Sequence, residues 1–127
     1  MHTELRKRAD GEAMRYRENR AYMQGVEDGL DAHTSISEKY HDCARWVWTV
    51  ERVREWLRLY EPAIEDFFAR YYALDGGTPR HARKRGENMV RVSVELHIGV
   101  STLYKWREHV LDQLVLAATQ AGALEPF

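Results

Sequence analysis

The chain has 127 residues, of which 19 are Lys or Arg, 20 are Asp or Glu, and 44% are hydrophobic. This length predicts one domain or two small ones, and the apolar content excludes a disordered tail. The single Cys excludes an internal disulfide and a Cys-rich zinc site. No apolar run reaches the length of a transmembrane helix, and the N-terminus lacks the apolar stretch of a signal peptide. We therefore expect a cytoplasmic protein that does not span a membrane.

Charge is distributed unevenly along the chain. Residues 78–110 carry seven basic and three acidic groups, whereas residues 1–77 carry 12 basic and 15 acidic groups. A locally basic segment suits a polyanion-binding surface, although clustering by chance gives the same pattern. Cations at the start of a helix oppose its macrodipole, so local helix stability does not explain the densest basic run. We interpret this run as phosphate-binding, with a solvated charge run as the alternative: Arg80, Arg83, Lys84 and Arg85.

Runs of β-branched residues are nearly absent, which predicts an all-α fold. The first segment in chain order, residues 1–34, has thinly spread apolar positions and is interrupted by Gly11, Gly25 and Gly29. We expect an N-terminal arm or helix there, whose order depends on a partner.

A long helix is predicted over residues 36–60, opened by a capping box from Ser35 to Glu38. Its apolar positions step by three and four residues, as in a heptad seam: Cys43, Trp46, Val50, Val53, Leu57 and Tyr60. Such a seam is either the core-facing stripe of a small bundle or the contact surface of a homodimer. We expect a homodimer, because a chain of this size leaves such a seam partly uncovered.

A short aromatic helix follows, with Pro62 in its first turn and an apolar stripe that runs from Ile64 to Leu74. Asp75-Gly76-Gly77 is predicted to end it, which makes residues 35–77 a helical hairpin. Thr78 and Pro79 are then expected to start the next helix.

Residues 89–114 fit the pattern of a helix-turn-helix, in which a second helix is held for insertion into the major groove. Val92 and Leu96 point inward on the first helix, and the small Ser93 lies where the helices cross. His97 takes the position where the turn usually has Gly, and Ile98 fills the turn. The second helix has four inward positions: Leu103, Trp106, Val110 and Leu114. The whole DNA-binding region is expected at residues 78–122, followed by a tail at 123–127.

The outward positions of the second helix are predicted to read base edges: Ser101, Tyr104, Lys105 and Glu108. Lys105 suits guanine and Glu108 suits cytosine, while Tyr104 suits a phosphate or a thymine methyl group. Thr102, Arg107 and Arg91 are predicted to contact phosphates together with the basic run.

The segment LHIGVSTLYKWREHVLDQLVLAA resembles the C-terminal part of phage transcriptional regulators of the RinA and ArpU type. Those proteins have a core L-x-I-S-x-S-T-x-Y-x-W, in which Gly99 of this chain replaces a Ser and His97 replaces a small or polar residue. The resemblance covers residues 38–120 and includes the spacing of the upstream aromatic residues. It implies a fold similar to region 4 of bacterial sigma factors. It also implies a protein of the bacterial host cytoplasm that activates phage or prophage genes and contacts host RNA polymerase.

Other site types have little support in the sequence. The six His residues lack metal-ligand spacing, and Cys43 lies on the apolar seam, so we expect no metal site and no cofactor. Glu61 and Glu65 are one helical turn apart, but such a pair is usually a solvated surface, or in an activator an acidic patch for a protein partner. No P-loop, GxSxG or GxGxxG pattern occurs, so we do not expect an enzyme.

The sequence therefore predicts a transcriptional regulator that binds double-stranded DNA at a promoter or operator. Two alternatives remain open. One is a small terminase subunit that binds phage DNA for packaging. The other is a helical adaptor protein that does not bind DNA.

Overall fold

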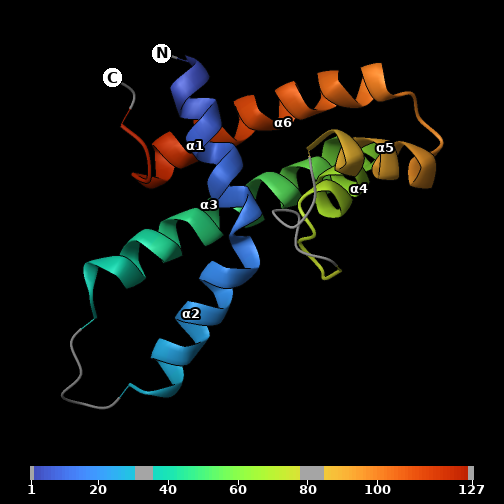
Figure 1. The fold of residues 1–127 in the computed structure, drawn as a ribbon. Helices are drawn as coiled ribbons and strands as arrows, with labels where there is room; N and C mark the ends of the chain where they lie inside the picture. The colour runs from blue at the N-terminus through green and yellow to red at the C-terminus, as the bar shows by residue number, and fades with distance from the viewer. Residues whose placement is uncertain (1, 31–35, 78–84, 126–127) are drawn as a thin grey trace.

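The structure is a computed structural model that describes residues 2–30, 36–77 and 85–125. These residues form six helices and no strand, so the predicted all-α class is confirmed (Figure 1). None of these helices combines the length and the apolar character that are needed to cross a bilayer. The helices are α1 (His2–Met14), α2 (Tyr16–Asp28), α3 (Glu38–Tyr60), α4 (Pro62–Tyr71), α5 (Arg85–Leu96) and α6 (Val100–Ala121).

The long helix α3 begins at Glu38 rather than at residue 36. Its N-cap is Ser37, whose hydroxyl oxygen accepts a hydrogen bond from the backbone N–H of Tyr40 at 3.3 Å. The predicted cap Ser35 lies outside the described residues. Both serines precede the same apolar pattern, and the register of the cap was therefore ambiguous in the sequence.

The seam of α3 is buried within a single chain from Cys43 to Leu57, whereas Tyr60, the last position of the predicted seam, is 68% exposed. Cys43, Trp46, Val50, Val53 and Leu57 are at most 8% exposed. Helices α1, α2, α4 and α6 all contact α3 and cover this stripe. The seam is therefore core, and the expectation of a homodimer loses the uncovered surface on which it was based.

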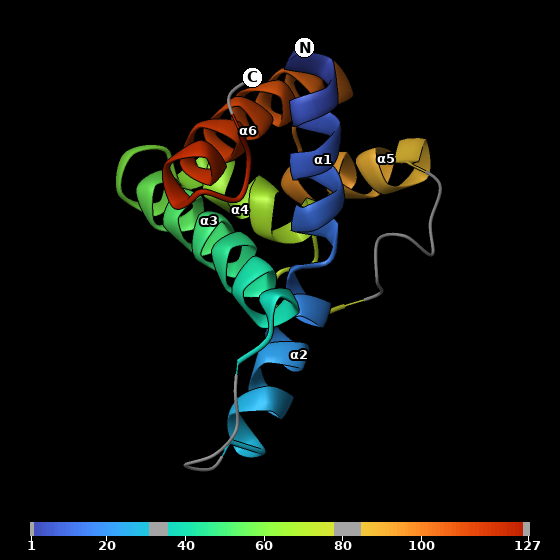
Figure 2. The same ribbon diagram turned by 90° about the vertical axis from the view of Figure 1, so that its left-hand side faces the viewer.

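The described part of the N-terminal segment is helical, which is one of the two forms expected for it, and α1 is part of the core. Ala9 and Ala13 are fully buried, because their small side chains allow α1 to approach the other helices closely. Helix α1 crosses α6, and α2 packs along the first half of α3 (Figure 2). Gly11 and Gly25 lie within α1 and α2, where tertiary contacts outweigh their low helix propensity, while Gly29 is the C-cap at the end of α2.

Helix α4 has Pro62 in its first turn, as predicted, and lies at the centre of the fold. Phe67, Phe68 and Tyr71 are at most 1% exposed, and α4 contacts α3, α5 and α6. The helix ends at Tyr71, earlier than the predicted Asp75-Gly76-Gly77. Leu74 is still buried, but it belongs to the turn that follows the helix.

The close approach of α1 predicts a sensitivity to side-chain volume. Ala13→Leu should lower the free energy of unfolding by about 1–3 kcal/mol, because extra methylenes in a packed core force side chains and backbone to shift. The matched control is Ala21→Leu at an exposed position of α2, which should change stability by less than about 0.5 kcal/mol. Denaturant unfolding of both variants measures the difference. Equal stabilities would show that α1 does not pack as described.

Candidate nucleic-acid interface

Helices α5 and α6 are joined by only three residues, His97, Ile98 and Gly99. His97 has φ 57°, in the left-handed region that favours Gly, at the position where the turn was expected to carry Gly. The Ser93 hydroxyl donates to the carbonyl oxygen of Ile98 at 2.5 Å and ties the turn to α5. The connection is therefore short and tight, and its role as the turn of a DNA-binding helix-turn-helix stays a prediction.

The inward positions of this helix pair lie where the spacing placed them. Val92, Leu103, Val110 and Leu114 are fully buried. Trp106 is half-buried, and its ring lies edge-on to Phe67 at 6.2 Å between centroids. Helix α6 is therefore fixed in rotation by apolar contacts on one side.

The opposite side of α6 is open. Ser101, Thr102 and Lys105 are exposed, and Tyr104 is 41% exposed. Successive helical residues are 100° apart, so Ser101, Tyr104 and Lys105 share one face. We call the stripe formed by Ser101, Tyr104, Lys105 and Glu108 the outer face of α6. A side of this kind, with hydroxyl, phenol and ammonium groups, can donate hydrogen bonds to base edges or phosphates.

Glu108 is on the outer face, but it is not a free acceptor. Its Oε2 lies 2.6 Å from Nη1 of Arg6 on α1. Any contact between Glu108 and a base must therefore compete with this ion pair.

Arg107 is a correction to the predicted phosphate contacts. Its side chain is 13% exposed, and its guanidinium pairs with Asp10 of α1 at 3.3 Å. Asp10 also accepts a 2.7 Å hydrogen bond from the phenol of Tyr72, and burial together with this carboxylate holds the pKa of Tyr72 well above its usual range. Arg107 therefore fastens α6 to α1 inside the molecule. The signal in the sequence was its spacing, four residues after Leu103 and three before Val110.

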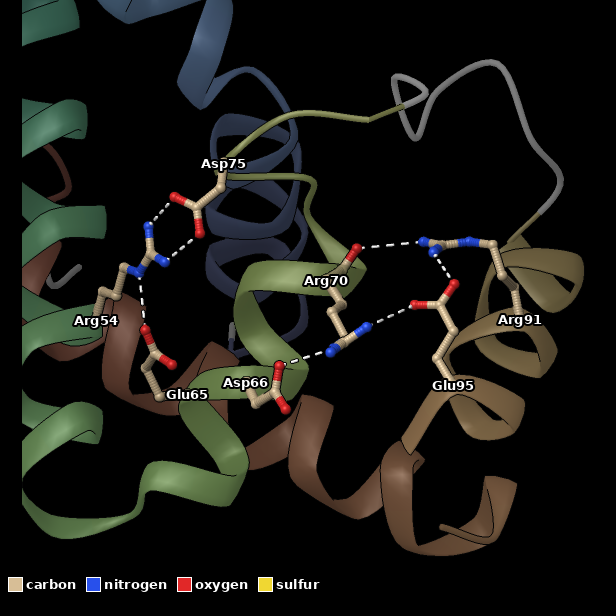
Figure 3. Close-up of polar contacts among 7 residues, drawn as sticks. All are labelled: Arg54, Glu65, Asp66, Arg70, Asp75, Arg91 and Glu95. Carbon is tan, nitrogen blue, oxygen red and sulfur yellow. Dashed lines mark hydrogen bonds and ion pairs between the residues drawn. The ribbon is translucent and has the colours of Figure 1, made fainter. Parts of the chain in front are cut away.

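Arg91 is a second correction, because its guanidinium joins α5 to α4 (Figure 3). Its Nη2 donates to the carbonyl oxygen of Arg70 at 3.2 Å and to the side-chain oxygen of Asn88 at 2.7 Å. Its Nη1 donates to Glu95 at 2.7 Å, and the same carboxylate also receives a hydrogen bond from Arg70. These partners engage both Nη atoms of Arg91, and its Nε is buried without a hydrogen-bond partner, so the guanidinium is turned toward the fold and not toward an incoming phosphate.

Three of the four cations of the basic run lie outside the described residues. These are Arg80, Arg83 and Lys84, and Thr78 and Pro79 are outside the described residues as well. Arg85 is the first residue of α5. These four cations remain predicted phosphate contacts.

The acidic pair proposed as a possible patch for a protein partner is used within the fold. Glu65 lies 2.9 Å from Nε of Arg54 on α3 (Figure 3). Glu61 lies 2.8 Å from Nε2 of His109 on α6. Both carboxylates therefore connect helices and do not form an open acidic surface.

Two residues beside the outer face were missed by sequence reasoning. Arg6 on α1 contacts α6, and Lys7 lines the same shallow hollow of about 310 Å³ between α1 and α6. No spacing signal could find them, because they are separated from α6 by about 100 residues of chain.

Comparisons with protein-family models, with curated proteins and with solved structures found no match for this chain. The functional assignment therefore rests on the residues and their arrangement.

The largely enclosed ion pair of Arg107 with the buried Asp10 predicts an effect on stability. Arg107→Met should cost about 3–5 kcal/mol of unfolding free energy, because it removes the cation that faces the buried carboxylate of Asp10. Lys105→Met, two residues away on the exposed side, is the control and should cost less than about 0.5 kcal/mol. Thermal and denaturant melts measure both variants. Similar losses for the two variants would mean that the rotation of α6 is wrong.

Proposed function

We propose that this protein binds double-stranded DNA in a sequence-specific manner and regulates transcription, as an activator of phage or prophage genes. The observation that carries this proposal is the outer face of α6. It is exposed and polar, while the opposite side of the same helix is anchored in the core by Leu103, Trp106 and Val110.

The proposed mechanism places the first half of α6 in the major groove. In Figure 1 this half extends beyond the crossing with α1. Lys105 would donate to guanine, and Ser101 and Tyr104 would contact neighbouring bases or the thymine methyl group. Because α6 is held rigidly by α4 and α5, these side chains keep a fixed geometry toward the groove.

Phosphate contacts would come from the basic run before α5 and from Thr102. Backbone contacts of this kind set the position of a protein on the duplex without reading its sequence. The removal of Arg91 and Arg107 from this set leaves Arg80, Arg83, Lys84 and Arg85 as its cationic members.

The proposed partners are a promoter or operator duplex and host RNA polymerase. Trp48, Leu59 and Tyr60 are exposed on α3 at 45%, 70% and 68%, and exposed large apolar side chains suit contact with a protein. The same surface fits the two alternative functions, a small terminase subunit and an adaptor protein. A ring of many subunits in light scattering favours the terminase, and no affinity for any duplex favours the adaptor.

Selection of bound sequences from random DNA tests the proposal directly. A single enriched motif is expected for a regulator. Binding without an enriched motif would contradict sequence-specific regulation.

Salt dependence provides a quantitative prediction. The logarithm of the association constant for any duplex should fall with the logarithm of salt concentration, with a slope of about −0.9 per phosphate contacted. Changing Arg83, Lys84 and Arg85 together to Ala should reduce this slope by about 0.9 for each cation that touches a phosphate. The matched control changes three arginines of α2 and α3 to Ala: Arg20, Arg45 and Arg52. An equal loss of slope in the control would mean that only net charge matters.

Base reading predicts a different effect for Lys105. Lys105→Ala should weaken binding to the selected motif by roughly 1–3 kcal/mol and relax preference at one base position. Its melting temperature should change little, because the side chain is exposed. Its affinity for unrelated DNA should fall much less than its affinity for the selected motif, because only the motif offers the base that Lys105 reads. Lys39→Ala, at the start of α3, is the control cation. Unchanged specific binding by the Lys105 variant would mean that the outer face does not read bases.

A further inference from the structure

Two carboxylates lie on or beside the surface proposed to face DNA. Glu108 is part of the outer face of α6, and Asp112 follows it one helical turn later. On a helix with 100° per residue, Asp112 lies within about 40° of Ser101, Lys105 and Glu108. The side chains of Glu108 and Asp112 are 54% and 55% exposed, so both negative charges are accessible from solvent. Left alone, such a pair would repel the phosphates of a duplex placed against α6.

One cation from the other end of the chain spans both acids. The Nη1 of Arg6 lies 2.6 Å from Glu108 Oε2, while its Nη2 lies 2.6 Å and its Nε 2.8 Å from Asp112 Oδ1. A guanidinium suits this task because its planar fork presents several donors at once, whereas an ammonium is a single point charge. The hydrogen bond to Asp112, helped by the charge of both acids, raises the pKa of Arg6 above its ordinary value, and the cation is permanent.

Arg6 is not needed to hold α1 against α6, because other contacts between the two helices do so. The buried pair of Arg107 and Asp10 and the fully buried Ala9 already fix α1 against α6. Arg6 is 34% exposed and lies at the edge of this contact, where an ion pair contributes little to stability. Lys7 lines the same hollow and adds a second cation at this edge.

We infer that Arg6 is a positioning residue of the DNA-binding surface, which offsets one of the two negative charges of Glu108 and Asp112 and so allows the phosphate backbone to approach α6. This inference rests on the proposed function. It assigns the N-terminal helix a role in binding, by cancellation of unfavourable charge and not by direct contact with a phosphate.

The test uses the full chain and an unrelated 20-base-pair duplex at low salt, so that base reading by Glu108 does not enter. Arg6→Ala should weaken binding about fivefold or more, because two uncompensated charges then face the duplex. The triple variant Arg6→Ala, Glu108→Gln, Asp112→Asn should bind at least as tightly as the wild type, because it removes the acids as well as the cation. Arg20→Ala is the matched control. It removes a cation from another exposed pair between helices, with Glu51 at 3.7 Å, and should change affinity less than twofold.

The outcomes separate the inference from the function. If the triple variant stays as weak as Arg6→Ala, Arg6 touches phosphate itself and the inference is wrong. If Arg6→Ala binds like the wild type while the wild type keeps its salt slope, the inference is again wrong but the function stands. If the wild type binds no duplex at any salt concentration, the proposed function fails and the inference falls with it.

A melting curve shows whether Arg6→Ala still folds. If it does not, a second variant tests the inference. Glu108→Gln with Asp112→Asn keeps Arg6 and changes the summed charge of these three side chains from −1 to +1. This double variant should bind the same duplex more tightly than the wild type, because no acid then opposes the approach of a phosphate. Unchanged or weaker binding by this variant overturns the inference.

Discussion

The fold depends on the burial of the aromatic residues of α4. This helix is only ten residues long, yet Phe67, Phe68 and Tyr71 are almost completely excluded from solvent. A helix this short is not stable alone in water, and it exists because α3, α5 and α6 surround it. Each of those helices in turn uses α4 to cover its own apolar side. The rotation of α6 is therefore set by packing, through the contact between Phe67 and Trp106.

Around this apolar centre, arginines act as connectors between helices. Arg54 joins α3 to Glu65 of α4 and to Asp75 in the turn that follows, and Arg70 and Arg91 join α4 to α5 through Glu95 (Figure 3). Such pairs are partly exposed, so they contribute specificity of arrangement more than stability. Because of these pairs, a basic residue in the sequence cannot be assumed to be free to contact DNA. Several of them already have carboxylate partners within the chain.

The proposed DNA-binding surface is consequently built from distant parts of the chain. Helix α6 supplies the exposed polar side, α4 and α5 hold its opposite side, and α1 adds Arg6 at one edge. The N-terminal segment has few apolar residues, but it completes this surface and the core beneath it. Its alanines matter because they are small, which allows the close crossing of α1 and α6.

Local sequence patterns were enough to predict the all-α class, the seam of α3 from Cys43 to Leu57, the start of α4 at Pro62, and the inward positions of α6 from Leu103 to Leu114. These features follow from local rules, namely a period of 3.6 residues and the conformational preference of proline. Contacts between distant segments were needed to show that the seam of α3 is covered within one chain and that Arg107 is largely enclosed. Periodicity gives the phase of a helix, but it does not say which other helix lies against it. A charged residue becomes internal only when a distant partner meets it, as Asp10 does for Arg107.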